Sequence, residues 1–341
     1  MDISPLQWVV TIGVTAAVLL FDVVVIARKP HEPSIRECAI ALAVYIGAAL
    51  AFAGFIFATA GRDADGDLYG TQFITGWLVE YSLSVDNLFV FIILMAALKV
   101  PRKYQQEALM VGIILALIFR GIFIALGYQL ISNFSWVFYL FGAFLVYTAA
   151  NLVKSYRDDD HSDDADDNRV VAFARRKLNV GEEFRGLKLS WHEHGVRVIS
   201  PMLIVIIALG TTDLLFALDS IPAIFGITQE PYLVFTANVF ALMGLRQLYF
   251  LLGGLLKRLI YLSLGLSFIL AFIGVKLVIH ALHEDQPFGI NGGEPIVGFE
   301  VPTLLSLGVI IVTLAVTAVA SLYVDRKREA AGVSSQGSGL E

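Results

Sequence analysis

The stretch LVEYSLSVDNLFVFI, residues 78–92, decides how the rest of the chain is interpreted. It contains no proline or glycine and is predicted to be helical, yet it lies inside a long apolar run and carries two carboxylates, Glu80 and Asp86. A carboxylate at the centre of a bilayer costs about 2.5–3.5 kcal/mol on insertion scales. Two of them in one span therefore indicate a functional segment.

The composition is that of an integral membrane protein. The 341 residues are 57% hydrophobic and 16% charged, and the mean hydropathy is +0.75. The net charge of −6 says little, because residues 154–197 alone hold 10 acidic and 9 basic side chains. The single cysteine, Cys38, excludes an internal disulfide framework and a thiolate metal cluster.

The apolar stretches predict an all-α polytopic membrane protein with nine transmembrane helices. The first begins at the N-terminus without a basic leader, so we expect a retained helix and not a signal peptide. The nine spans are expected at residues 6–27, 34–60, 71–98, 107–131, 134–154, 198–225, 231–256, 259–281 and 302–324.

The loop charges predict an orientation. Basic residues follow the first, third, fifth, seventh and ninth spans, whereas the other loops are neutral or acidic and carry only Arg62. The positive-inside rule then places the N-terminus outside and the C-terminus in the cytoplasm. A multi-pass protein of a bacterial-type inner membrane is the expectation, with the lipid bilayer as its surroundings.

Two parts of the chain repeat each other. The sixth span, ALGTTDLLFALDSIPAIFG, carries Asp213 and Asp219 with the same six-residue separation as the acids of the third span. The strings GIILALIFR and NVFALMGLR both end in arginine, at Arg120 and Arg246, and YLFGAFLVYTAANLVK matches YLSLGLSFILAFIGVK. Spans three to five and six to eight thus form an inverted repeat of three-helix units, an architecture of secondary transporters with a midplane substrate site.

This pattern divides the chain into six parts. They are two N-terminal helices (1–70), repeat 1 (71–154), an acidic and basic cytoplasmic loop (155–197), repeat 2 (198–284), an outer loop with the ninth span (285–328), and a disordered tail that resembles a vector-derived remnant (329–341). In the cytoplasmic loop, RDDDHSDDADDN is either a solvated spacer or a low-affinity cation sensor. His192 and His194 form either a polar interfacial turn or a metal site.

The intramembrane acids favour a site for a hard divalent cation. Oxygen ligands suit Mg²⁺, Ca²⁺ or Mn²⁺, whereas Zn²⁺ and Cu⁺ prefer histidine and cysteine. Six helical steps turn through about 600°, so two acids on one helix face a common ion only if the helix opens locally, which Pro222 favours in the sixth span. The predicted metal ligands are Glu80, Asp86, Asn87, Asp213 and Asp219, supported by Thr212, Ser220, Pro222, Arg120, Arg246 and Asn238.

Three motifs carry a resemblance to a known family. The strings LSVDNLFVF, FALDSIPAIF and FALMGLRQLYFLL resemble the TerC/Alx family of integral membrane proteins, in the same order over residues 5–325. The resemblance implies metal-ion homeostasis with manganese export, and it places the family's acids at the four positions already singled out. Family members often have lysine at Tyr81 and a further glutamate at Gly210, and we expect these two departures to be a charge pair lost jointly.

The expected function is therefore a secondary transporter that exports Mn²⁺ or another divalent cation as substrate, with proton exchange as a natural coupling and no permanently bound cofactor. No Walker motif for ATP is present, and no nucleic-acid or enzymatic role is expected. An intramembrane aspartyl protease is the enzymatic alternative, but the Gly-x-Gly-Asp string is absent. The other alternative is a membrane scaffold in which the acids form static ion pairs with Arg120 and Arg246.

Overall fold

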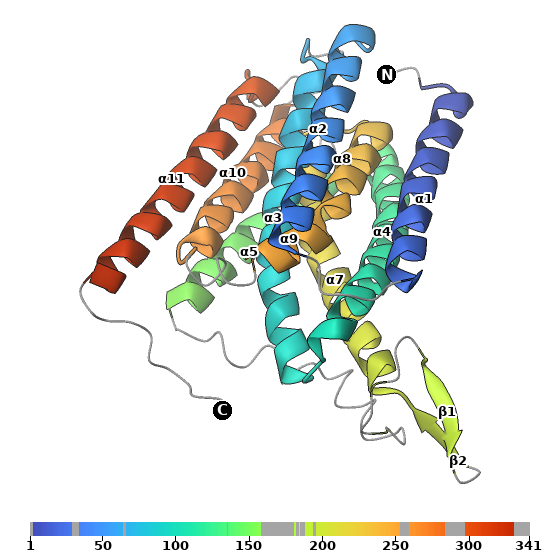
Figure 1. Ribbon diagram of the computed structural model, residues 1–341. Coiled ribbons are helices and arrows are strands. Elements are labelled where there is room, and N and C mark those ends of the chain that lie inside the picture. Colours follow the sequence, from blue (N-terminus) through green and yellow to red (C-terminus); the bar gives the residue numbers. More distant parts are fainter. Residues whose placement is uncertain are drawn as a thin grey trace.

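The computed structural model describes residues 3–28, 34–63, 66–134, 136–157, 181, 184, 188–193, 196–252, 259–283 and 297–330. Within them the chain forms a bundle of long helices with one small β-hairpin (Figure 1). The helices are α1 (Pro5–Arg28), α2 (Ile35–Thr59), α3 (Tyr69–Ala97), α4 (Arg102–Asn133), α5 (Val137–Arg157), α7 (Pro201–Phe225), α8 (Pro231–Met243), α9 (Leu245–Leu252), α10 (Leu262–His283) and α11 (Thr303–Ala330).

Eight helices of the described residues are long and apolar enough to cross a membrane. They are α2, α3, α4, α5, α7, α10 and α11, together with α8 and α9 as one unit over Pro231–Leu251. The first predicted span coincides with α1, which contributes a shorter apolar stretch, Pro5–Val18. The multi-pass architecture is thus confirmed, while the total of nine spans stays a prediction.

The all-α prediction misses a β-hairpin that precedes α7. β1 (Ser190–Glu193) pairs antiparallel with β2 (Val196–Ile199), so the predicted start of the sixth span is strand. The helix begins only at Pro201, where Ser200 caps it by accepting a hydrogen bond from the Met202 amide. His192 is exposed on β1, whereas the acidic run 158–167 and His194 lie outside the described residues. The tail prediction overlaps α11 by two residues, and residues 331–341 lie outside the described part.

The expected opening of the sixth span is wrong. α7 continues as α-helix from Pro201 to Phe225 with Pro222 inside it. The interruption lies instead in the seventh span, where α8 ends and α9 begins on either side of Gly244. A Cβ at Gly244 would lie 3.1 Å from the Leu42 Cδ1 atom of α2, so this break is closely packed.

The helices pair crosswise between the two predicted repeats. α3 packs against α8, α4 packs against α7, and α5 packs along α10. The last pair approaches closely, because a Cβ on Gly142 would lie 2.8 Å from the Gly274 carbonyl oxygen and one on Gly274 would lie 2.8 Å from the Gly142 carbonyl oxygen. This pairing is the one that two inverted three-helix units would give, and the repeat itself stays a prediction.

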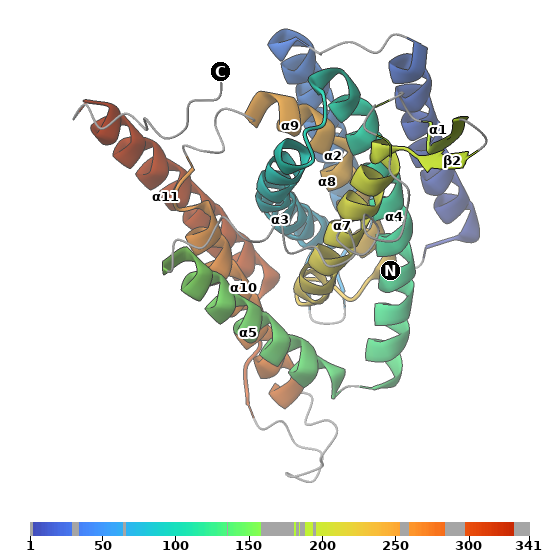
Figure 2. The same cartoon turned by 90° about the horizontal axis from the view of Figure 1, so that it is seen from below.

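Two groups of helices are visible in the view from below. α5, α10 and α11 lie beside one another at one side of the bundle that contains α3, α4, α7 and α8 (Figure 2). The first residues of α1 lie at one end of the molecule, and the hairpin and the last residues of α11 lie at the other (Figure 1). Figure 1 also shows that α3 runs toward the hairpin end, whereas α7 begins there and runs away from it, so the two helices that carry the acids are antiparallel.

Candidate functional site

A buried cluster of charges joins four helices at the centre of the bundle. Arg120 on α4 donates from Nη1 to the carboxylate of Glu80 on α3 and to Asn238 Oδ1 on α8, the latter at 2.7 Å. Its Nη2 atom lies 3.7 Å from Asp213 Oδ1 on α7. The four residues are at most 2% exposed. We call Glu80, Arg120, Asp213 and Asn238 the central cluster.

The charges of the central cluster do not balance. Two carboxylates face one guanidinium, and Glu80 Oε1, Asp213 Oδ2 and Arg120 Nε have no hydrogen-bond partner among the described residues. Breaking a buried ion pair by removing one partner costs about 3–5 kcal/mol, because the remaining charge is left uncompensated. Arg120 is therefore the shared counter-charge of Glu80 and Asp213, and its structural role stays a prediction.

The other two predicted acids lie apart from Arg120 and have hydroxyl partners. Ser263 Oγ on α10 donates to Asp86 Oδ1 at 3.2 Å, and Thr148 Oγ1 on α5 donates to Asp219 Oδ1 at 3.1 Å. Both aspartates are half-buried. Each therefore contacts the third helix of the opposite predicted repeat, although Thr148 and Ser263 are not at equivalent positions of the two matched strings. We call Asp86 and Asp219 the flanking carboxylates.

The four acids occupy three levels along the bundle. Six residues of α-helix rise by about 9 Å, which is the axial separation of Glu80 from Asp86 and of Asp213 from Asp219. Because α3 and α7 run in opposite directions, the flanking carboxylates lie on opposite sides of the central cluster (Figure 1). Asp86 lies toward the end of the molecule that bears the hairpin, and Asp219 lies toward the other end.

The remaining predicted residues are distributed around these positions. Asn87, Thr212, Ser220 and Pro222 are buried within α3 and α7. Arg246 lies on α9, which packs against α2. In the amide orientation of Gln247 that gives both of its ends a hydrogen bond, Arg246 Nη2 donates to the Gln247 amide oxygen at 2.9 Å. No three histidine, cysteine, aspartate or glutamate side chains of the described residues are grouped closely enough to hold a metal ion. In this conformation the predicted ligands thus do not form a single cage.

The two positions that depart from the family pattern have different neighbours. The Tyr81 ring lies 5.8 Å from that of Trp77 and close to Gly244, whereas a Cβ at Gly210 would contact Leu115 and Phe119 of α4. Their joint loss as a charge pair stays a prediction.

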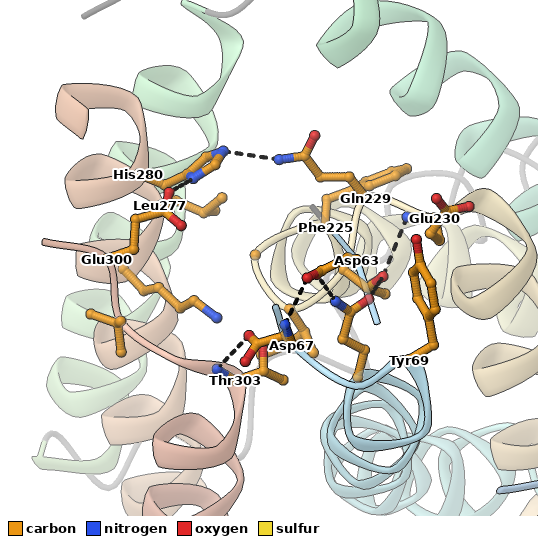
Figure 3. A pocket seen from close by; sticks show the side chains of 16 residues that line it. Asp63, Asp67, Tyr69, Phe225, Gln229, Glu230, Leu277, His280, Glu300 and Thr303 are labelled. Atoms are coloured by element: carbon orange, nitrogen blue, oxygen red, sulfur yellow. Dashed lines mark hydrogen bonds and ion pairs between the residues drawn. The ribbon is translucent and has the colours of Figure 1, made fainter. Parts of the chain in front are cut away.

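A polar pocket lies at the end of the bundle toward which Asp219 is placed. It has a volume of about 380 Å³ and lies between the α2–α3 loop, the α7–α8 loop and the segment before α11 (Figure 3). Its charged and titratable lining residues are Asp63, Asp67, Glu230, Lys276, His280 and Glu300. Four carboxylates against one lysine make this pocket acidic. The sequence indicated acidic loops at this end but not that three of them meet.

Hydrogen bonds tie the walls of the pocket together. Asp63 accepts from the Asp67 amide at 2.7 Å and from the Gln72 side chain, which in turn accepts from Thr228 Oγ1 at 2.6 Å. On the opposite wall, His280 Nδ1 lies 2.6 Å from Glu300 Oε1 (Figure 3). The pocket is therefore held by contacts between segments distant in sequence.

Comparisons with known proteins give consistent matches. The model of the integral membrane protein TerC family matches residues 66–329. An uncharacterized membrane protein of Mycobacterium tuberculosis is 42% identical over 96% of this chain and 82% of its own length. An uncharacterized membrane protein of Myxococcus xanthus is 38% identical over 81% of this chain and 84% of its own, and the putative membrane-bound redox modulator Alx of Escherichia coli is 32% identical over 96% and 97%. No solved structure matches the chain.

Proposed function

Because the chain belongs to the TerC family of integral membrane proteins, we propose that it is a secondary transporter that exports a divalent metal cation across a bacterial inner membrane, with Mn²⁺ as its substrate. The observation that carries the proposal is the pair of flanking carboxylates, which occupy matched positions in the sequence and lie one on each side of the buried central cluster. Two inverted repeats that rock against each other would expose these carboxylates in turn.

The proposal assigns the cation to the flanking carboxylates. Asp86 receives the ion from the cytoplasmic side with Asn87 and the Ser263 hydroxyl, and Asp219 takes it toward the outside with Ser220 and the Thr148 hydroxyl. A hard cation that keeps part of its hydration shell needs only one or two carboxylates at each position. This fits the absence of a larger ligand group in the described residues.

The central cluster is proposed to be the barrier between the two positions. The guanidinium of Arg120 lies between carboxylates from both repeats and pairs with both of them, so it occupies the position that a cation would take at this level. Transport therefore requires the cluster to rearrange when the repeats move. An unneutralised carboxylate in a dry site tends to take up a proton, which makes proton exchange the expected coupling.

The polar pocket of Figure 3 is proposed to be the exit on the outer side. Its four carboxylates attract a cation that leaves Asp219, and its volume of about 380 Å³ accommodates a hydrated ion. The pocket is assigned to the outer side because the basic loops, which the positive-inside rule places in the cytoplasm, belong to the opposite ends of the helices.

Flux into proteoliposomes tests the proposal. Purified protein is reconstituted, Mn²⁺ uptake is followed with an internal metal dye, and a second dye reports internal pH. We expect flux in the wild type that Asp86→Asn and Asp219→Asn each abolish, with a proton signal of opposite direction. Absence of flux under every gradient, with the protein still folded, would contradict a transport function.

A scaffold role is the second candidate, and one observation favours it. Glu80 and Asp213 are held by Arg120, as static ion pairs between helices would be. A scaffold does not require that each flanking carboxylate accept from a hydroxyl on the third helix of the opposite predicted repeat. The name of the Alx relatives suggests redox modulation, but this chain has a single cysteine and therefore no internal dithiol to oxidise.

A further inference from the structure

An apolar groove lies on the three helices α5, α10 and α11, at one side of the bundle that contains the central cluster (Figure 2). It has a volume of about 750 Å³, within the roughly 300–1,000 Å³ of small-molecule sites, and α5, α10 and α11 line it. Its walls come from the C-terminal halves of α5 and α11 and the N-terminal half of α10. They include Val146, Ala150, Leu264, Phe268, Ala271 and Val316. The groove is therefore confined to the half of the membrane that the loop charges place on the cytoplasmic side.

Small side chains create the hollow. α5 and α11 both pack on α10, and where they diverge the wall positions are occupied by Ala149, Ala150, Ala271 and Ala320. At Gly265 the two helices α10 and α11 touch, because a Cβ there would collide with Thr317. The floor is thus fixed by helix packing, and Phe268 is 56% exposed on its rim. A flexible apolar chain fits this shape.

The cytoplasmic end of the groove has a different chemistry. Tyr261 lines it, and the ring of Tyr156 lies 6.4 Å from that of Tyr261. Lys154 follows the wall residue Val153 and is exposed, and the exposed Arg326 and Lys327 come within two turns of the wall residue Ala320. With Asp325 beside them, the basic residues leave this end with a net charge of +2.

We propose that this groove is a binding site for an anionic phospholipid. The acyl chain lies in the apolar groove, and the phosphate headgroup lies between Lys154, Lys327 and the two tyrosine hydroxyls. Aromatic and basic side chains at the interface are the groups that recognise anionic headgroups. A zwitterionic lipid fits the groove equally well but gains nothing from the net positive charge, so the charge commits the site to an anionic one.

The site has a consequence for motion between the two predicted repeats. Its walls belong to α5 and α10, the helices that pack along each other and that also donate hydroxyls to the flanking carboxylates. A bound lipid bridges these helices and α11 from the membrane side. The inference itself stands on the groove and its charges and does not depend on cation transport.

Native mass spectrometry of the purified full chain tests this site. The probes are phosphatidylglycerol and phosphatidylethanolamine with identical acyl chains, added in equal amounts. We expect retained phosphatidylglycerol on the wild type, and we expect Ala150→Trp, which fills the groove, to remove it. Ala48→Trp, at an exposed position of α2, is the matched control and retains the lipid. Equal retention by both tryptophan variants would overturn the assignment.

The headgroup is tested separately. Lys154→Ala and Lys327→Ala each lower the preference for phosphatidylglycerol over phosphatidylethanolamine by about fivefold, the effect of one basic residue near an anionic surface. Lys99→Ala, which removes an exposed lysine on another helix end, leaves the preference unchanged. If neither Lys154→Ala nor Lys327→Ala alters the preference for phosphatidylglycerol, the assignment of an anionic lipid is contradicted. A dimer that Ala150→Trp dissociates, with no lipid on either form, would show that a second copy of the chain fills the groove.

Discussion

The two acids of the central cluster and the two flanking carboxylates are the same kind of side chain but have different surroundings. Glu80 and Asp213 are at most 2% exposed and share one guanidinium, whereas Asp86 and Asp219 are half-buried and have a hydroxyl among their partners. A carboxylate that is buried away from water needs a permanent counter-charge, whereas a half-buried carboxylate can exchange one hydrogen-bond partner or ion for another. Equal spacing in sequence therefore does not mean equal surroundings.

The same difference separates the two matched arginines. Arg120 lies on the uninterrupted helix α4 and reaches acids from α3 and α7. Arg246 follows the break at Gly244 and lies on α9, which packs against α2. The break therefore gives the two arginines, which occupy matched positions in the sequence, different surroundings. Alternating access requires that the two repeats differ in this way within any one conformation.

Removal of Arg120 is expected to have the largest effect. Arg120→Met leaves Glu80 and Asp213 buried without a counter-charge, so we expect a loss of about 3–5 kcal/mol in stability. Thermal unfolding of the detergent-solubilised protein measures it as a large drop in Tm. The triple variant Glu80→Gln, Arg120→Gln, Asp213→Asn removes all three charges and is expected to recover most of the loss. A wild-type Tm for Arg120→Met alone would remove the distinction between the two pairs of acids.

Neutralising a flanking carboxylate is expected to affect transport and not folding. Asp86→Asn and Asp219→Asn keep the shape and the hydroxyl contact but remove the charge that attracts the cation. We expect at least the roughly 10–100-fold loss of activity that follows damage to the surroundings of a metal site, with little change in Tm. A loss of folded protein comparable to that of Arg120→Met would instead give these aspartates a structural role.

The hydroxyl partners are expected to give the smallest effect. Thr148→Val and Ser263→Ala remove one hydrogen bond each from Asp219 and Asp86, and we expect KM for Mn²⁺ flux to rise about two- to tenfold, as the loss of 0.5–1.5 kcal/mol gives. Because each variant removes one hydroxyl donor from a flanking carboxylate, the two variants should behave alike. An effect confined to one of them would mean that the two sides are not equivalent steps of one path. Ser132→Ala, at an exposed hydroxyl near the end of α4, is the control.

Hydropathy and the spacing of the acids predicted much of this architecture. Membrane helices are long apolar segments, so eight of the predicted spans reappear as helices with ends shifted by a few residues. The hairpin at 190–199 was missed because its valines and isoleucine extend the apolar run of the next helix. The break at Gly244 was missed because a single glycine is tolerated within membrane helices.

The sequence pattern could not predict which side chains contact the four acids. The spacing gave four equivalent carboxylates, and only tertiary packing decides that Arg120 reaches two of them while Ser263 and Thr148 reach the others. The expectation that the sixth span opens near Pro222 is wrong, because α7 continues as α-helix past Asp219 to Phe225. Proline at this position removes one hydrogen bond without ending the helix.

Mn²⁺ binding to the protein in lipid nanodiscs, measured by isothermal titration calorimetry, tests the division between the two pairs of acids most directly. Asp86→Asn and Asp219→Asn are compared with Glu80→Gln, and Tm is recorded for each variant. The account predicts at least about tenfold weaker binding for the two aspartate variants, corresponding to 1.4 kcal/mol or more, and unchanged affinity for Glu80→Gln. Equal weakening by all three variants at unchanged Tm would contradict it and would establish a single site made of both pairs.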